Sequence, residues 1–216
     1  MSPAGDASSM DQKLIAWARS VKARARRTPC AALPPLWVFT DADRLPDPAA
    51  LLRRLPRGLC GVVLRPGACR TEAALHAVLA ICRDRRFVVT SVDEPSVRGF
   101  VQRHLRAKGG AHGLGTLSAA AHTPSELRRA ARAGARCVFL SPAFATRSHP
   151  GMRALGACRW GLLAARSPVP VFALGGVTGE TVRMLPRRWL HGAGIIGAAV
   201  DVAKPPHCSA NAMDAA

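Results

Sequence analysis

The sequence has few of the features that define a class of protein by themselves. It contains no tyrosine, and aromatic residues make up only 5% of its 216 residues. No uninterrupted apolar run reaches the roughly 18–20 residues that a membrane-spanning helix needs. No long apolar core followed by small residues lies near the N-terminus, so no secretory signal is evident. We therefore expect a cytoplasmic protein that does not enter a membrane.

Cysteine usage argues against two further kinds of site. The seven cysteines are odd in number, no two are spaced as CxxC, and several lie in apolar segments, as Cys137 does in ARCVF. A disulfide framework or a zinc site would need paired or closely spaced cysteines. The pattern instead predicts buried thiols in a reducing compartment.

Acidic residues are scarce. Asp and Glu number 13 against 31 Lys and Arg, which gives a formal charge of +18. The arginines are spread along the chain, with one local cluster at Arg24, Arg26 and Arg27. The few aromatic residues do not interleave with them as a base-stacking platform requires, so nucleic acid is disfavoured as a partner. An arginine-rich solvated surface and an anionic small-molecule substrate remain as explanations.

From residue 36 onward, short apolar runs alternate with amphipathic segments. The apolar runs lack a two-residue alternation, which is typical of parallel strands covered on both faces. The length and the 49% hydrophobic content fit one domain with a sizeable core. The predicted strands span 36–40, 59–65, 87–91, 114–119, 137–141, 169–174 and 194–198, with an eighth somewhere in 102–112.

Eight such strands predict an α/β fold of the (β/α)8 TIM barrel type. An open doubly wound sheet is the alternative, but no GxGxxG follows the first strand, which disfavours a dinucleotide-binding fold. We expect a basic N-terminal helix and linker over 1–33, the barrel over 34–203 and a disordered tail over 204–216. The predicted helices cover 11–27, 48–55, 71–83, 95–105, 124–133, 155–166 and 180–185.

The carboxyl ends of the strands carry the active site in a barrel of this kind. Gly175 and Gly176 follow the seventh predicted strand and allow backbone amides to approach a phosphate closely. A tight turn explains the same pair without a ligand. The hydroxyls of Thr146 and Ser148 and the charge of Arg147, after the sixth strand, favour the phosphate interpretation.

Two further side chains stand at predicted strand ends. Arg65 ends an otherwise apolar strand, so we expect it in the barrel mouth, where a guanidinium binds diphosphate through its planar fork. An ion pair with a neighbouring acid such as Asp41 is an equal alternative. His122 follows the fifth strand, where it is either a general acid or base or a hydrogen-bonding residue at a helix entry.

Several segments together resemble the thiamine phosphate synthase/TenI family. These are AHTPSELRRAARAGARCVFLSPAFATRSHPGMRALG at 121–156, then PVPVFALGGVT and GAGIIGAAVDV. LSPAFATRSHPG is similar to the sixth-strand signature of that family and ALGGVT to its seventh. LWVFTDADRLPDP and LPRGLCGVVLR resemble its first two strands. The similarity covers roughly 34–203 and is specific in the C-terminal half.

The resemblance implies a (β/α)8 barrel and a reaction. Thiamine phosphate synthases join an aminopyrimidine diphosphate to a thiazole phosphate with magnesium and release pyrophosphate. By position, Arg65, Thr146 and Ser148 match residues that bind the pyrimidine diphosphate. The residues that match the backbone cradle of the thiazole phosphate are Gly175, Gly176, Ala198 and Ala199.

The magnesium part of the family pattern is not kept. Ser91 stands where the family has an aspartate that binds the metal, and no acidic residue follows His104 and Leu105 closely. Mg²⁺ prefers hard oxygen ligands in an octahedral array. Magnesium would therefore arrive on the substrate diphosphate or be held by Asp93.

Three functions follow from these observations. The first is a thiamine phosphate synthase-like transferase in thiamine biosynthesis, acting on phosphorylated small molecules. The second is a TenI-like protein, either a thiazole tautomerase that uses His122 without a metal or a non-catalytic binder of thiazole or thiamine phosphates. The third is a basic protein associated with nucleic acid, which would require binding that depends steeply on salt.

Overall fold

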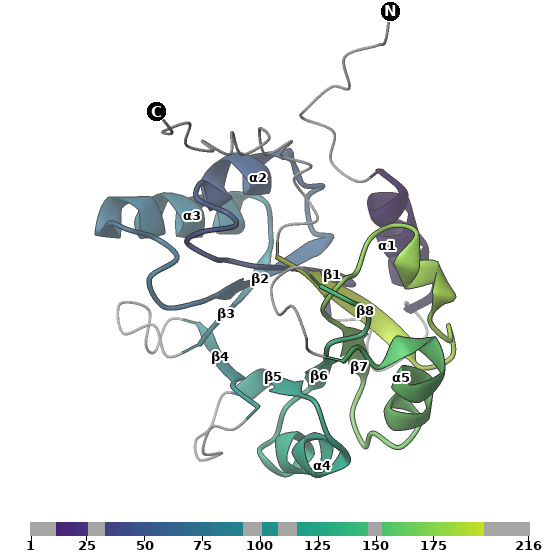
Figure 1. The fold of residues 1–216 in the computed structure, drawn as a ribbon. Coiled ribbons are helices and arrows are strands. Elements are labelled where there is room, and N and C mark those ends of the chain that lie inside the picture. Colours follow the sequence, from purple (N-terminus) through teal and green to yellow (C-terminus); the bar gives the residue numbers. More distant parts are fainter. Residues whose placement is uncertain (1–11, 26–32, 93–100, 108–115, 147–152, 197–216) are drawn as a thin grey trace, which may run out of the picture.

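The computed structural model describes residues 12–25, 33–92, 101–107, 116–146 and 153–196. Its eight parallel strands form a closed barrel in which neighbours in sequence are neighbours in space and β8 returns to β1 (Figure 1). The predicted (β/α)8 fold is confirmed. The strands are β1 (Leu36–Phe39), β2 (Cys60–Leu64), β3 (Val88–Ser91), β4 (Gln102–Leu105), β5 (Thr116–Ala121), β6 (Cys137–Leu140), β7 (Val171–Ala173) and β8 (Leu190–Ile195).

The helices lie outside the ring of strands (Figure 1). The extra N-terminal helix is present and buries an apolar stripe that includes Leu14, Ala18 and Val21. Lys13 on this helix forms an ion pair with Glu180 at 2.8 Å, which joins the helix to the segment between β7 and β8. The helices are α1 (Gln12–Ala25), α2 (Pro48–Arg54), α3 (Glu72–Asp84), α4 (Pro124–Arg132), α5 (Gly156–Ala164) and the short 3-10 helix η3 (Thr181–Met184).

Three sequence predictions need correction or narrowing. The helix predicted over 95–105 is wrong at its C-terminal end, because residues 102–105 form β4, the eighth strand placed within 102–112. Parallel pairing with β3 and β5 on both sides overrides the local helical pattern. The last strand begins at Leu190 rather than at residue 194. The helix predicted over 180–185 is a single 3-10 turn. Residues 95–100 and the predicted tail over 204–216 lie outside the described part of the chain.

Aromatic rings fill the inside of the barrel, and glycines on the neighbouring strands leave room for them. Trp37 pairs with Gly61, where a Cβ atom would lie 2.5 Å from the indole ring. Phe172 pairs with Gly192 in the same way. The ring of Phe139 makes edge contacts with those of Trp37, Phe39 and Phe172 at centroid distances of 4.9–5.7 Å. Gly192 and Gly194 of β8 therefore leave room for rings inside the barrel. Because glycine disfavours a strand, the sequence of β8 shows only a weak strand pattern.

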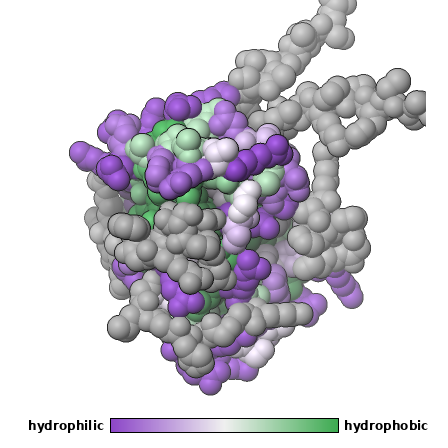
Figure 2. Space-filling view, turned by 90° about the vertical axis from the view of Figure 1, so that its left-hand side faces the viewer, coloured by the Kyte–Doolittle hydropathy of each residue, from purple (hydrophilic) through white to green (hydrophobic). Residues whose placement is uncertain are grey.

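A second core lies between the strands and the helices and holds most of the buried aliphatic side chains. Figure 2 shows the side of the molecule that lies on the left in Figure 1, with hydrophobic residues exposed between hydrophilic ones. Within the described ranges, no helix combines the length and the apolar character needed to cross a membrane.

The cysteines that the structure describes form no disulfide bond with one another. Cys60, Cys82 and Cys137 are buried, as the sequence predicted for several of the cysteines, whereas Cys158 is exposed. Burial raises the pKa of both Cys60 and Cys82 to about 12. These two thiols are therefore protonated packing residues near neutral pH.

Candidate active site

An ion cluster lies at the carboxyl ends of β1 and β2. Trp37 and Phe39 point into the barrel, and Asp41 continues this alternation past the end of β1, as Arg65 does for β2. Asp41 Oδ2 accepts hydrogen bonds from Arg65 Nη1 at 2.8 Å and from Arg44 Nη2 at 2.7 Å. The ion pair considered for Arg65 therefore forms, and Arg44 joins it.

The cluster keeps a net positive charge. Asp41 is 10% exposed in its side chain, and Arg65 is 40% exposed. Burial by itself raises the pKa of Asp41, but the hydrogen bonds and charge of Arg44 and the charge of Arg65 outweigh it and lower that pKa. The two guanidinium groups and the one carboxylate that the structure describes here sum to one positive charge, which attracts an anion. Sequence reasoning missed Arg44, whose only signal was its spacing three residues after Asp41.

The backbone of Arg65 is held as well as its side chain. Thr40 is fully buried, and its Oγ1 accepts a hydrogen bond from the Arg65 amide at 2.9 Å. The same hydroxyl donates to the carbonyl of Val63 at 3.2 Å. Arg65 therefore leaves the strand in a fixed direction, while the remaining N–H groups of its guanidinium form no bond to any described residue.

A buried histidine lies at the same level of the barrel mouth. The registers Leu64↔Ser91 and Ser91↔Arg103 place the next residues, Arg65 and His104, at equal height with one strand between them. His104 is 5% exposed, and burial together with the positive charge of Arg65 lowers its pKa to about 3. Its ring is neutral near pH 7. The sequence analysis did not select it as a site residue, although a polar residue in the short β4 was a signal.

His122 directly follows β5. Its backbone amide donates to Glu126 Oε2 at 2.6 Å, within the capping box that starts α4 at Thr123. Its ring Nδ1 lies 2.8 Å from the carbonyl oxygen of Ser141 and 3.2 Å from the hydroxyl of that serine. Donation of Nδ1–H to the carbonyl leaves the lone pair on Nε2, which bonds to no described residue. His122 thus holds the helix entry with its backbone and has one ring nitrogen available for proton transfer.

The two glycines after β7 have conformations and surroundings that exclude a side chain. Gly175 has φ +87° and Gly176 has φ +64°. A Cβ atom at Gly175 would lie 3.0 Å from Pro142 Cα, and one at Gly176 would overlap the carbonyl oxygen of Ala145. The loop after β6 therefore packs directly on this pair, which forms the tight turn that the sequence allowed.

The same turn presents backbone amides. The carbonyl of Gly175 accepts a hydrogen bond from the amide of Phe144 at 3.0 Å, and that of Gly176 accepts one from Thr181 Oγ1 at 2.9 Å. No described residue accepts a hydrogen bond from the amides of Gly175, Gly176 or Val177. Consecutive free N–H groups of this kind bind phosphate oxygens. The turn and the phosphate interpretations are therefore compatible.

The remaining predicted site residues are less well defined. Thr146 is half-buried at the end of the described loop after β6. The others lie outside the described residues; they are Asp93, Arg147, Ser148, Ala198 and Ala199. The structure thus brings Arg65, His122 and the glycine pair to one end of the barrel.

The described residues do not fit a magnesium site. Ser91 is buried at the end of β3, where the family pattern has a carboxylate. Asp41 is engaged by two arginines, and Glu126 caps α4. Across the described ranges, no three His, Cys, Asp or Glu side chains come together as metal ligands would.

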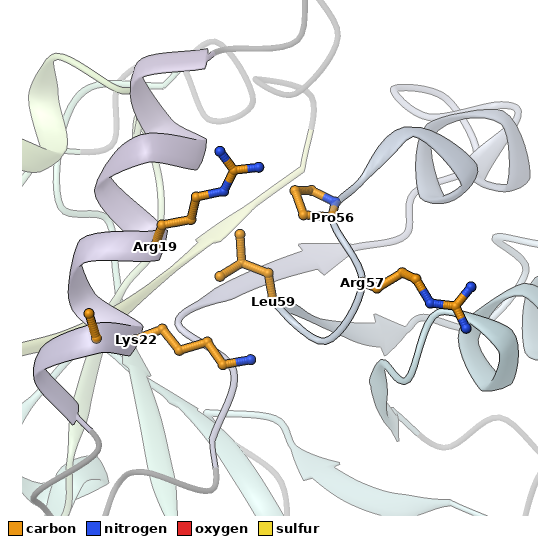
Figure 3. Close-up of a pocket in the computed structure, with 6 residues that line it drawn as sticks. Arg19, Lys22, Pro56, Arg57 and Leu59 are labelled. Carbon is orange, nitrogen blue, oxygen red and sulfur yellow. The ribbon is translucent and has the colours of Figure 1, made fainter.

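A separate cavity of about 300 Å³ lies at the other end of the barrel (Figure 3). It is formed by α1 and by the loop that leads into β2, with Arg19 and Lys22 on one side and Pro56 and Leu59 on the other. Lys22 donates to the carbonyl of Gly58, and Arg57 turns away to form an ion pair with Asp84. This cavity lies at the amino end of β2, so it is not part of the candidate active site.

The fold and the site define a (β/α)8 barrel that presents basic side chains and free amides at the carboxyl ends of its strands. Residues 106–200 match the family model described as thiamine monophosphate synthase (TMP-TENI), which confirms the family resemblance. This match lies in the half of the chain where the sequence motifs were most specific.

Solved structures agree on the fold. Thiamine phosphate pyrophosphorylase from Pyrococcus furiosus is 19% identical with a TM-score of 0.65 over 82% of this chain and 91% of its own. N-acetylmannosamine-6-phosphate 2-epimerase from Clostridium perfringens is 12% identical with a TM-score of 0.53 over 82% and 92%. A structure titled native KDPGal is 19% identical with a TM-score of 0.54 over 76% and 82%. No curated protein matches the sequence. At these identities the structures support the barrel and not a reaction.

Proposed function

We propose that this chain is a thiamine phosphate synthase-like transferase that joins an aminopyrimidine diphosphate to a thiazole phosphate and releases pyrophosphate. The observation that carries the proposal is that two anion-binding features lie at the same end of the barrel. One is the Arg44–Asp41–Arg65 cluster, and the other is the run of free amides at 175–177. The family match over 106–200 supports the same reaction class.

Each feature has a separate role in this proposal. The guanidinium of Arg65 stabilises the negative charge that builds up on the departing diphosphate as its bond to the pyrimidine methylene carbon breaks. The amides of Gly175 and Gly176 hold the phosphate of the thiazole, so that its ring nitrogen attacks that carbon. Because the described residues do not form a metal site, we propose that magnesium accompanies the diphosphate, with Asp93 as the remaining candidate ligand.

The test is the complete reaction with the full chain. The two substrates are incubated with magnesium and, in parallel, with a chelator, and thiamine phosphate and pyrophosphate are measured. Stoichiometric formation of both products with magnesium supports the transferase. Binding of the thiazole phosphate without any product contradicts it.

A second function is favoured by one observation, the fixed tautomer of His122. With Nδ1–H held by the Ser141 carbonyl, Nε2 is the nitrogen that takes a proton from a bound thiazole, as a tautomerase requires. This reaction needs no metal.

The His122→Ala variant separates the two functions. If the chain is a tautomerase, the variant loses at least a hundredfold in isomerisation rate, within the usual contribution of general acid–base catalysis. The exposed His76 on α3 provides the control, since His76→Ala leaves the rate unchanged. A His122→Ala variant that isomerises the thiazole normally removes the tautomerase hypothesis.

A further inference from the structure

The charged residues that the structure describes are distributed unevenly along the barrel axis. Most of the acidic ones follow β1 or begin a helix at the carboxyl ends of the strands; these are Asp41, Asp43, Asp47, Glu72, Glu126 and Glu180. The described loops that enter β2, β3, β6, β7 and β8 lie at the opposite end, and each carries an exposed arginine; these are Arg57, Arg86, Arg136, Arg166 and Arg187. Asp84 is the acidic residue described at that end. The amino end of the barrel is therefore strongly basic.

Three segments of this end form one continuous surface. Lys22, near the end of α1, donates to the carbonyl of Gly58 in the loop before β2. The amide of Gly58 donates in turn to the carbonyl of Arg85 before β3 at 2.8 Å, and Arg57 forms an ion pair with Asp84 at 3.2 Å. We call this surface the amino-end basic face; its charged residues are Arg19, Lys22, Arg57, Asp84, Arg85 and Arg86. Five positive charges are therefore balanced by one negative charge.

Two guanidinium groups of the amino-end basic face have no polar partner in the described protein. Arg19 extends from α1 beside the cavity of about 300 Å³, with Pro56 and Leu59 opposite (Figure 3). Its guanidinium and that of Arg86 are exposed and form no hydrogen bond or ion pair with any described residue. Both groups are therefore available to an anion.

The backbone of Arg86 is strained. Arg86 has φ +55°, and it is the described non-glycine residue with a positive φ. Gly134, with φ +78°, ends α4 in the same way as Arg86 ends α3. In both turns this residue donates to the carbonyl three positions back, and the next residue donates to the carbonyl five positions back. Glycine adopts this conformation without strain, so the fold does not require an arginine there. The charge of Arg86 is kept at a cost in stability, which points to a function for that charge.

The arrangement of these charges suits a chain of phosphates. A guanidinium donates paired hydrogen bonds to phosphate oxygens. The charges come from three segments around the cavity, so a ligand with several phosphates contacts more of them than one with a single phosphate. A membrane surface is less suitable, because the apolar residues of α1 are buried against the barrel instead of being presented for insertion. The lack of interleaved aromatic residues argues against base stacking, but contacts to phosphates need none.

We propose that the amino-end basic face binds the phosphate backbone of nucleic acid without preference for base sequence. Arg19 and Arg86 supply guanidinium groups that the fold itself does not use. The face lies at the opposite end of the barrel from the candidate active site, so this binding does not depend on the proposed function.

The first experiment separates a role in binding from a role in folding. Arg86→Gly removes the charge and relieves the strain, so we expect a higher melting temperature together with weaker binding of a labelled mixed-sequence DNA duplex, by about threefold to tenfold. Fluorescence anisotropy measures the binding. The control is Arg70→Ala, which removes the same charge from an exposed residue at the carboxyl end, between β2 and α3. A variant Arg86→Gly with unchanged affinity overturns the proposal, and so does one with a lower melting temperature.

The second experiment compares two variants of equal net charge. Arg19→Glu with Arg86→Glu is expected to weaken binding more than tenfold and to reduce the slope of log Kd against log salt concentration by about 2, since each phosphate contact contributes about 0.9. Arg70→Glu with Arg153→Glu changes two exposed residues at the carboxyl end and is expected to keep most of the affinity and the slope. Equal losses in both variants show that the overall charge binds the duplex, which overturns the proposal.

Two further probes test the class of partner. Vesicles that contain phosphatidylserine represent an anionic membrane, and poly-glutamate represents an acidic protein. The unchanged protein is expected to bind the duplex more tightly than either probe at the same salt concentration. Tighter binding to the vesicles or to poly-glutamate overturns the assignment to nucleic acid.

Discussion

The two sides of the barrel mouth present different chemical groups. On the β1–β4 side the groups are side chains, namely the guanidiniums of Arg44 and Arg65 around Asp41 and the imidazole of His104. On the β5–β8 side they are the backbone amides after β7 and the imidazole of His122 after β5. The second side also contains the region that matches the family model.

This difference explains which family features the sequence keeps. A backbone cradle depends on conformations that only glycine adopts without strain, so its signature is short and specific. Side-chain charges can come from several positions, and here Arg44 joins Arg65 although nothing in the family pattern pointed to it. In this chain the side-chain half departs from the family pattern at Ser91, whereas the glycine pair follows it.

The largest expected effect comes from removing the charge on the β1–β4 side. Arg65→Ala is expected to lower the rate of thiamine phosphate formation about a hundredfold or more, as the loss of one charge-stabilising donor does in other enzymes. Asp41 keeps Arg44 as a partner, so the variant remains folded. The control is Arg166→Ala, since Arg166 is exposed before β7 at the other end of the barrel. Steady-state assays of both variants check this, and equal rates would remove Arg65 from the site.

The next largest effect is expected from a substitution that distorts the backbone on the β5–β8 side. Gly176→Ala places a Cβ against the Ala145 carbonyl at a positive φ, and we expect thiazole phosphate binding to weaken about tenfold to a hundredfold as the amides move. Gly134→Ala is the matched control, because Gly134 also has a positive φ but has no atom within 4 Å of an added Cβ. If both variants weaken binding equally, the free amides are not the phosphate site. Calorimetry with the thiazole phosphate decides between these results.

The smallest effect concerns stability and the buried histidine on the β1–β4 side. The unfolded state protonates His104 below pH 6.5, whereas the folded state resists protonation down to about pH 3. The unfolding free energy therefore falls as the pH drops through this window, by up to about 1.4 kcal/mol per pH unit from this group. The contribution of Asp41 to stability is lost only as the pH falls through about 3.8 and below, since its pKa is lowered from 3.8.

Denaturant unfolding between pH 7 and pH 5 measures this dependence. His104→Gln is expected to show a shallower loss of stability than the unchanged protein, because glutamine does not titrate. His76→Gln on α3 is expected to keep the original slope. Parallel curves for the His104 variant and the unchanged protein would show that His104 is not held neutral by the fold.

The sequence predicted most of the elements for identifiable reasons. Short apolar runs such as 36–39 and 137–140 predicted strands, and the Thr-Pro-x-Glu start of α4 marked a helix entry. The helix prediction over 95–105 was wrong at 102–105, because helical spacing is a local pattern whereas β4 is stabilised by pairing with its two neighbouring strands. The start of β8 was missed because its glycines are explained only by the rings of Phe172 and Phe39 on the two strands that pair with it.

The sequence by itself determined the alternation of elements, the barrel class and the glycine turn after β7, because these depend on local patterns and on short motifs. The tertiary structure decided that Asp41 pairs with Arg65 and that the ring of His104 meets the hydroxyl of Ser118. Those contacts join residues from different strands. Their distances depend on the register of the closed barrel, which no local pattern contains.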